Sequence, residues 1–254
     1  MKLLKLLILG GSGEAAALSR ALDRDARYDV TLSLAGRTTE PTLLPGKSRR
    51  GGFGGAENLA RVLAEEHYDL LIDATHPFAV QIKSNAIEAA RAAGVPLLAI
   101  RRPAWMPREG DRWTVVQSMD AASAALGETP RRVFLTTGRM ELAPFKEAPH
   151  HFYIVRSVEA PAPDELPPRV VLITARGPFN LADELALLQA HAVDLIVTKN
   201  SGGTGAVAKL DAARALSLPV IMVKRPDLPE APSVETVADA LAWLEHAHGS
   251  TKSA

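Results

Sequence analysis

The residues with the clearest chemical meaning form a glycine-rich segment near the start of the chain, Gly10-Gly11-Ser12-Gly13-Glu14. This segment follows an apolar run and opens a helical pattern. Glycines at such a junction let backbone N–H groups approach a phosphate at the N-terminus of the helix. We therefore interpret Gly11, Ser12, Gly13 and Glu14 as cofactor-binding residues. The spacing departs from G-x-G-x-x-G, and a tight turn that packs a helix on a strand is the alternative.

The end of the second expected strand indicates which cofactor this would be. Proteins that favour NAD usually carry an acidic residue there to hold the ribose 2′-hydroxyl. This chain instead has Ser33-Leu34-Ala35-Gly36-Arg37-Thr38, with an arginine and no carboxylate. A guanidinium matches a phosphate through paired hydrogen bonds, so Arg37 predicts a 2′-phosphate and hence NADPH. A solvent-exposed surface arginine is the alternative.

A second glycine-rich segment, Arg49-Arg50-Gly51-Gly52-Phe53-Gly54-Gly55, places four glycines around one phenylalanine. Glycines weaken regular structure and leave backbone donors exposed. We interpret Arg50, Gly52, Phe53 and Gly54 as part of a lid over a pyrophosphate, with Phe53 against a cofactor ring. A flexible linker is the alternative.

A histidine follows a later strand, in the segment Asp73-Ala74-Thr75-His76-Pro77-Phe78-Ala79. Ligands of open parallel sheets bind beyond the carboxyl ends of the strands. Thr75 is therefore a further cofactor-binding candidate, and His76 is a catalytic candidate. A purely structural histidine, followed by an ordinary proline at the first position of a helix, is the alternative.

Cations follow several strands of the second half of the chain. The segments are Thr136-Thr137-Gly138-Arg139, Arg176-Gly177-Pro178-Phe179 and Lys199-Asn200-Ser201-Gly202-Gly203-Thr204-Gly205. With Arg156, these cations would form a basic wall, which predicts a polyanionic ligand. We take Lys199 as a second catalytic candidate and Arg139, Arg176, Ser201 and Gly202 as substrate-binding residues, against the alternative of scattered, solvated cations. We find no carboxylate pair at glycosidase spacing, no serine elbow and no histidine cluster typical of a metal site.

Composition excludes several classes of protein. Lys and Arg number 29 and Asp and Glu also 29, so no overall charge favours nucleic acid or an anionic membrane. The absence of cysteine excludes disulfides, thiolate metal sites and a cysteine nucleophile. The apolar start of the chain is interrupted by Lys5 and by glycines, which favours a buried strand over a secretory signal. No apolar run is long enough to span a bilayer, so we expect a cytoplasmic protein without a membrane partner.

The chain also repeats itself. Ala89–Pro103 aligns without a gap with Ala212–Pro226, and seven of the fifteen positions are identical. Apolar runs alternate with helical patterns throughout, which indicates parallel strands with crossover helices. We therefore predict an α/β protein of two tandem Rossmann-like lobes, related by internal duplication, with a cleft between them. The expected lobes are residues 1–128 for NADPH and 129–254 for the substrate; the stretch 101–113 is an alternative hinge.

The alternation also predicts the individual elements. The expected strands are Lys5–Leu9, Val30–Leu34, Leu70–Asp73, Leu97–Ile100, Val133–Thr136, Tyr153–Val155, Val170–Ile173, Leu195–Val197 and Val220–Val223. Helices are expected around Leu59–Leu63, around Ile82–Ala90 with Gly94 at the end, and after Ser233 as N-cap.

Taken together, these segments resemble the precorrin-6A reductase family of corrin biosynthesis. The likeness runs in order over nearly the whole chain and is most specific at Asp73–Ala79 and Thr198–Gly203. It implies a two-lobed fold and the reduction of one carbon–carbon double bond of a ring-contracted tetrapyrrole by a reduced nicotinamide cofactor, which gives precorrin-6B. The carboxylates of such a substrate would account for a basic wall.

The resemblance also suggests a mechanism and leaves alternatives. Hydride would pass to one carbon and a proton to its neighbour, with His76, Lys199 and ordered water as candidate proton donors. A monomer or small homo-oligomer is expected. A cobalt-containing substrate, often linked with NADH, is the nearest alternative. A two-lobed transferase that uses a sugar nucleotide and a non-catalytic NADP sensor are more distant ones.

Overall fold

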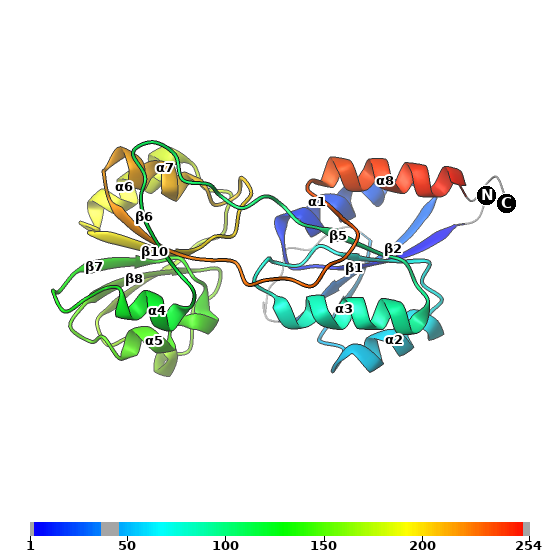
Figure 1. Cartoon of the computed structure of the whole chain (residues 1–254), viewed down its shortest axis with the longest axis horizontal. Helices are drawn as coiled ribbons and strands as arrows, with labels where there is room; N and C mark the ends of the chain where they lie inside the picture. Colours follow the sequence, from blue (N-terminus) through cyan, green and yellow to red (C-terminus); the bar gives the residue numbers. More distant parts are fainter. Residues whose placement is uncertain (1–2, 37–45, 251–254) are drawn as a thin grey trace. The chain divides into compact units, whose positions relative to one another are not determined.

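The computed structural model describes residues 3–36 and 46–250, and within them the chain divides into two units. One comprises Met1–Pro103 with Pro226–Ala254, and the other comprises Ala104–Arg225. Each unit contains a parallel β-sheet with helices on both faces (Figure 1). The two-lobed α/β architecture predicted from the alternating pattern is thereby confirmed.

The first unit, here called unit 1, is built on six strands in the order β3-β2-β1-β4-β5-β12. Its strands are β1 (Leu4–Leu9), β2 (Tyr28–Leu34), β3 (Lys47–Arg50), β4 (Leu70–Asp73), β5 (Leu97–Ile100) and β12 (Ser233–Val234). Its helices are α1 (Gly13–Leu22), α2 (Ala56–Glu65), α3 (Val80–Ala93) and α8 (Val237–Ser250). This strand order is that of a dinucleotide-binding Rossmann sheet.

The second unit, unit 2, has the order β9-β8-β7-β10-β11-β6, which is the same topology. Its strands are β6 (Arg112–Val116), β7 (Arg132–Leu135), β8 (Phe152–Ser157), β9 (Val170–Thr174), β10 (Leu195–Lys199) and β11 (Pro219–Val223). Its helices are α4 (Met119–Ala124), α5 (Ala143–Lys146), α6 (Leu181–Ala190) and α7 (Ala208–Ala215), with short 3₁₀ turns at Arg139–Glu141 and Pro163–Glu165.

The expected boundary between residues 128 and 129 does not match this division. β6 follows β5 along the chain but pairs with β11 of unit 2, whereas β12 near the C-terminus pairs with β5 of unit 1. The two halves of the sequence therefore exchange their last strand and helix. The chain passes from one unit to the other after Pro103, inside the stretch that the sequence had marked as an alternative hinge, and again after Arg225.

Alternation along the central strand explains how unit 1 holds its helices. Leu6 and Ile8 of β1 lie in the apolar cluster that contains residues of α1 and α8. Leu7 and Leu9 lie in the cluster that contains residues of α2 and α3. Because both faces of a doubly wound sheet are covered, its central strands are apolar at every position. Figure 1 shows α1 and α8 on one face of this sheet and α2 and α3 on the other.

Most expected elements are present, and the exceptions have local causes. The nine strands expected from apolar runs are all found, with small shifts at their ends. β3, β6 and β12 were missed because β3 has the polar sequence KSRR, three of the five residues of β6 are exposed and β12 has only two residues. Gly94 ends α3 in the left-handed conformation, as predicted.

The prediction that Ser233 caps the last helix is wrong. Ser233 lies in β12, and Thr236, directly before α8, caps the helix instead. Its hydroxyl accepts a hydrogen bond from the N–H of Asp239, whose carboxylate accepts the N–H and the hydroxyl of Thr236. This reciprocal arrangement satisfies donors that a helix N-terminus leaves unpaired.

We expect Gly10→Ala to destabilise the protein by about 1–3 kcal/mol, the usual cost of an inserted methyl group in a packed core. A Cβ at Gly10 would lie 2.7 Å from a methyl carbon of the buried Leu32. Gly13→Ala is the matched control, because nothing lies within 4 Å of a Cβ there. Urea unfolding of both variants measures the effect. Equal stability of Gly10→Ala and wild type would show that β1 and β2 do not need glycine at this junction.

Candidate functional site

The candidate cofactor site of unit 1 lies where its strand order reverses, between β1 and β4. Leu9 at the end of β1 is in register with Asp73 at the end of β4. The chain leaves these two strands through Gly10–Ser12 and Ala74–His76. Two sequence-predicted segments, separated by more than 60 residues, therefore meet at the point where Rossmann sheets bind ligands.

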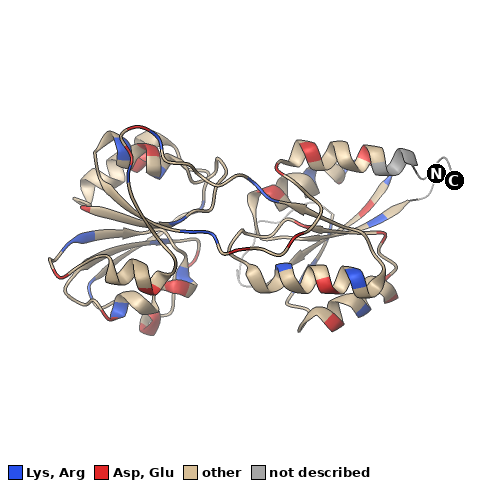
Figure 2. Cartoon of the chain, viewed as in Figure 1, with Lys and Arg blue, Asp and Glu red and all other residues tan. Residues whose placement is uncertain are grey.

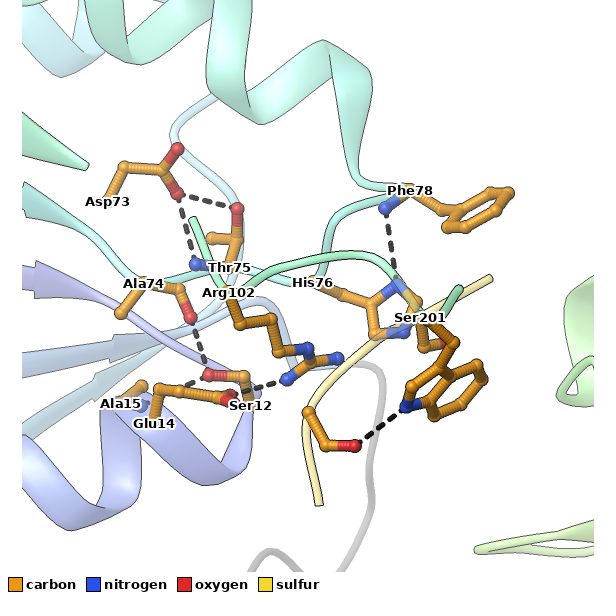
Figure 3. Close-up of polar contacts among 12 residues, drawn as sticks. Ser12, Glu14, Ala15, Asp73, Ala74, Thr75, His76, Phe78, Arg102 and Ser201 are labelled. Carbon is orange, nitrogen blue, oxygen red and sulfur yellow. Dashed lines mark hydrogen bonds and ion pairs between the residues drawn. The ribbon is translucent and has the colours of Figure 1, made fainter. Parts of the chain in front are cut away.

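Ser12 joins these two loops. It is the N-cap of α1, and its hydroxyl oxygen accepts the N–H of Ala15 at 3.0 Å. The same hydroxyl donates to the carbonyl of Ala74 at 2.6 Å (Figure 3). Because its side chain is engaged in this way, Ser12 can offer a ligand mainly its backbone, together with the N–H groups of the first helical turn.

Glu14 in the first turn of α1 pairs with Arg102, with 2.5 Å between the guanidinium and the carboxylate (Figure 3). Burial would raise the pKa of the Glu14 carboxyl, but the hydrogen bond and the positive charge of Arg102 outweigh it, so the pKa lies below its ordinary value. Glu14 is therefore ionised at neutral pH and holds a cation beside the helix N-terminus. Sequence reasoning had not singled out Arg102.

Asp73 ends β4 and organises the next loop. Its Oδ1 accepts the N–H of Thr75 at 3.0 Å and the hydroxyl of Thr75 at 2.6 Å. Its Oδ2 accepts a hydrogen bond from the ammonium of Lys83 at 3.0 Å, and both side chains are buried. Lys83 was missed, although its spacing from Ala86 and Ala90 puts it on the apolar face of α3 and could have revealed it.

His76 follows directly and is half-buried. Its Nδ1 accepts the N–H of Phe78 at 3.2 Å (Figure 3). An acceptor nitrogen carries no proton, so the neutral ring has its proton on Nε2. Protonation of Nδ1 would break the bond to Phe78. In this arrangement His76 is a hydrogen-bond donor through Nε2–H.

A third group lies beside the end of β2, where Ser33 of β2 is in register with Arg49 of β3. The Arg49 guanidinium donates to the hydroxyl of the buried Ser33 at 3.3 Å and stacks 3.8 Å from the centre of the Phe53 ring. Phe53 also packs against the α2–α3 core cluster. The structure therefore makes Arg49 a candidate cofactor-binding residue. The sequence had favoured Arg50, which is exposed, and Arg37, which lies outside the described residues.

The glycine-rich segment after Arg50 leads into α2. Gly52 and Gly54 are exposed, and Gly55 precedes the helix with a φ of +128°, which favours glycine. The lid role proposed for Gly52, Phe53 and Gly54 stays a prediction.

In unit 2 the reversal point lies between β7 and β10, which are paired. Thr136–Gly138 follows β7 and Asn200–Gly203 follows β10. Lys199 therefore ends the strand equivalent to the one that precedes His76, as the duplication predicted. Its ammonium lies 2.6 Å from a carboxylate oxygen of Glu141 in the turn after β7. Thr137 is 3% exposed, and its hydroxyl has no hydrogen-bond partner in the part of the chain that the structure describes.

The loop after β10 is held by aromatic and cationic side chains. The Trp105 backbone N–H donates to the Asn200 side chain at 2.8 Å, and the indole N–H donates to the Gly203 carbonyl at 2.8 Å. Arg225 donates to the carbonyls of Asn200 and Ser201 at 2.8 and 2.9 Å. Ser201 is half-buried and Gly202 is buried. The glycine-rich loop is thus fixed from two sides within unit 2.

Three of the four cations that the sequence grouped as a basic wall have carboxylate partners. Arg139 lies 3.3 Å from Glu159, Arg156 forms a buried pair with Glu184, and Lys199 pairs with Glu141. Arg176 is exposed. Figure 2 likewise shows Lys and Arg interspersed with Asp and Glu over unit 2. The interpretation as a continuous basic wall therefore needs correction. The sequence analysis did not expect these carboxylates, because no sequence signal pointed to them.

A buried lysine supports the same loop. The ammonium of Lys209 donates to the Ala206 carbonyl at 2.8 Å and lies 4.8 Å from the centre of a Trp105 ring. Burial lowers the pKa of Lys209 to about 7, and the positive charge of Arg156 acts in the same direction, whereas Glu184 opposes it. Lys209 therefore titrates near neutral pH.

The comparisons with known proteins identify the family. Residues 5–245 match the model of the family described as Precorrin-6x reductase CbiJ/CobK. The chain belongs to this family. A family member from Sinorhizobium sp, a precorrin-6A reductase, is 49% identical over 95% of this chain and 93% of its own length. A precorrin-6A reductase from Rhodococcus erythropolis is 46% identical over 94% of this chain and 97% of its own length.

The fold agrees with that of the family. A solved structure described as CobK precorrin-6A reductase superposes with a TM-score of 0.91 at 42% identity and covers 96% of each chain. A cobalt-precorrin-6A reductase from Priestia megaterium is 30% identical over 88% of this chain and 91% of its own length. In residues 3–36 and 46–250, no helix has the length and apolar character needed to cross a membrane.

We expect the free energy of unfolding to rise between pH 7 and about pH 10 because of Lys209. In this window the unfolded chain carries a proton on Lys209, whose ordinary pKa is 10.5, and the folded chain does not. The slope from one such group is at most about 1.4 kcal/mol per pH unit. Lys209→Met should remove the rise, and Lys224→Met, which changes an exposed lysine, should keep it. Denaturant unfolding at several pH values measures both. An unchanged slope in Lys209→Met would show that Lys209 stays protonated in the folded protein.

Proposed function

We propose that this protein is an NADPH-dependent precorrin-6A reductase of cobalamin biosynthesis. The observation that carries the proposal is family membership over residues 5–245. Five related precorrin-6A reductases are 42–49% identical to it, and three related cobalt-precorrin-6A reductases are 24–32% identical. This difference favours the metal-free substrate.

The residues at the reversal point of unit 1 fit a dinucleotide. A Cβ at Gly11 or at Gly13 would meet nothing within 4 Å, so the backbone at the start of α1 is open to a close approach. The helix N-terminus and the Arg102 cation beside it favour a pyrophosphate. We place the cofactor on Gly11–Glu14, with Thr75 on the adjacent loop. The bound nicotinamide would supply the hydride.

Arg49 is our candidate for the 2′-phosphate. It lies in β3 beside the end of β2, next to the Ser33 hydroxyl, and the end of β2 is where an acidic residue would bind an unphosphorylated ribose. Stacking on Phe53 holds the guanidinium plane in place, so less rotational freedom is lost when a phosphate binds. Arg37 and Arg50 are second candidates for the same phosphate.

We expect Arg49→Ala to weaken NADPH binding by roughly 10- to 150-fold, because one charge-assisted hydrogen bond contributes about 1.5–3 kcal/mol. Binding of NADH should be nearly unchanged. Calorimetric titration with NADPH, NADH and 2′,5′-ADP measures the difference, and Arg61→Ala on the exposed face of α2 is the control. If Arg49→Ala loses both cofactors equally, Arg49 does not read the 2′-phosphate, and Arg37→Ala is the next variant.

The substrate would lie against unit 2. Arg139, Arg176, Ser201 and Gly202 follow strands of that unit, and we propose that they bind tetrapyrrole carboxylates. The carboxylate of Glu159 already pairs with Arg139. A substrate carboxylate would therefore replace this internal partner at Arg139.

His76 and Lys199 remain the residues that we place at the reacting atoms. In the described tautomer His76 donates through Nε2–H, which suits it to hold a substrate or cofactor acceptor. Lys199 carries an ammonium proton that it can transfer, and Glu141 compensates its charge. We therefore propose Lys199 as proton donor and His76 as the donor that orients, with ordered water as the alternative source of the proton.

We expect His76→Ala and Lys199→Met each to lower kcat more than they weaken NADPH binding. General acid catalysis contributes roughly 10²- to 10⁴-fold, and the loss of an orienting hydrogen bond costs less. The assay follows NADPH oxidation and the absorbance of precorrin-6A under anaerobic conditions, with mass spectrometry for a product that has gained two hydrogens. A loss confined to KM for the tetrapyrrole would make either residue a binding group. If the wild-type protein forms no product from precorrin-6A and NADPH, the proposed function is wrong.

A further inference from the structure

Lys83 is a buried cation for which the proposed reaction has no use so far. It lies in the first turn of α3 with 2% of its surface exposed, and its partner Asp73 is 3% exposed. Replacement of a buried ion pair by apolar residues is often neutral or stabilising, so stability alone does not explain such a pair. The contacts of Lys83 indicate another purpose.

These contacts converge on one residue of the candidate site. The ammonium of Lys83 donates to Asp73 Oδ2 at 3.0 Å and to the Thr75 carbonyl at 3.4 Å. The other oxygen of Asp73 accepts both the N–H and the hydroxyl of Thr75. The pair therefore engages both backbone polar atoms of Thr75 and its side chain.

The residue before Thr75 is held as well. The N–H of Ala74 donates to the Leu9 carbonyl at 3.0 Å, and its carbonyl accepts the Ser12 hydroxyl. His76 is the next residue after this fixed segment, and the buried Pro77 restricts the backbone beyond it. The direction of the His76 ring thus follows from the segment that Lys83 and Asp73 hold.

We propose that Lys83 is a positioning residue of the reductase reaction. Acting through Asp73 and Thr75, it holds the loop so that His76 keeps its Nδ1 on the Phe78 N–H and presents Nε2–H. The part that concerns catalysis rests on the function proposed above. The part that concerns the ring of His76 can be measured without substrate or cofactor.

Two double variants separate charge from positioning. Asp73→Leu/Lys83→Met removes the ion pair and all hydrogen bonds to Thr75, but leaves no unpaired charge. Asp73→Asn/Lys83→Gln also removes both charges, but retains amide groups that can bond to each other and to Thr75. Both variants avoid the uncompensated buried charge that a single substitution would create.

The first readout is the ¹⁵N spectrum of the histidine rings in the ligand-free protein, which distinguishes protonated from unprotonated ring nitrogens. The chain has seven histidines, so His76→Gln serves to assign the His76 signals. Wild type and Asp73→Asn/Lys83→Gln should show one tautomer with the proton on Nε2. Asp73→Leu/Lys83→Met should show averaging between the two tautomers.

The second readout is turnover. Asp73→Leu/Lys83→Met should lower kcat by roughly 10- to 100-fold, the scale of a misplaced catalytic contact, and Asp73→Asn/Lys83→Gln should recover most of it. The proposal is wrong if the Leu/Met variant folds with an unchanged His76 spectrum and an unchanged kcat. Should that variant not fold, Thr75→Val replaces it, because it removes the 2.6 Å bond to Asp73 and leaves the ion pair. An unchanged His76 tautomer in Thr75→Val would then overturn the proposal.

The two proposals fail in different ways. Normal turnover of His76→Ala would remove the proposed role of His76 in the reaction and leave the tautomer result intact. Normal turnover and a normal spectrum in Asp73→Leu/Lys83→Met, together with an impaired His76→Ala, would remove only the role of Lys83.

Discussion

Asp73 ends β4 inside unit 1, and burial of a carboxyl group is costly unless it has hydrogen bonds and a partner of opposite charge. Lys83 supplies the charge, and Thr75 supplies two of the donors. In satisfying this one group, the chain engages Thr75 in the loop that carries His76, and the adjacent Ala74 carbonyl accepts the hydroxyl of Ser12 at the start of α1. A buried carboxylate is thus linked to both loops of the reversal point.

Unit 2 has the same strand order as unit 1, but different polar contacts at its reversal point. The turn after β7 contains Glu141, which pairs with Lys199 at the end of β10, so charges meet across the reversal point itself. The loop after β10 is held by hydrogen bonds from Trp105, Arg225 and Lys209. In unit 1, by contrast, the carboxylate of Asp73 at the end of β4 holds the next loop. One duplicated topology therefore carries two arrangements: the Glu14–Arg102 pair beside a helix N-terminus in unit 1 and the Glu141–Lys199 pair across the reversal point in unit 2.

Much of this fold could be predicted from the sequence, because buried parallel strands are apolar runs and the duplication is visible in aligned residues. β3, β6 and β12 could not, because edge strands are polar or short. The exchange of β6 and β12 between the two sheets could not be predicted either. Sequence similarity shows that two segments are alike, but it does not show to which sheet each segment belongs.

Residues of the candidate site could be predicted where a motif follows a strand. They could not be predicted where a residue matters through an ion pair with a distant part of the chain. Their positions directly after or at the end of strands pointed to Gly11, Thr75, His76 and Lys199 as candidates. Glu141, Glu159 and Arg102 were missed because an ion pair between residues far apart in the chain leaves no local pattern. Lys83 is intermediate, since its place on an apolar helix face is a signal that could have been used.

The most direct test of the central claim, that unit 1 binds the nicotinamide cofactor at its reversal point, is hydrogen–deuterium exchange of the full chain with and without NADP⁺. Bound cofactor should slow the exchange of backbone amides in residues 10–16, 49–56 and 73–79, because ligand contacts and reduced local opening both protect amides. Residues 136–142 and 199–207 should exchange at the same rate in both samples. Protection confined to these two segments of unit 2, with unit 1 unchanged, would contradict the account.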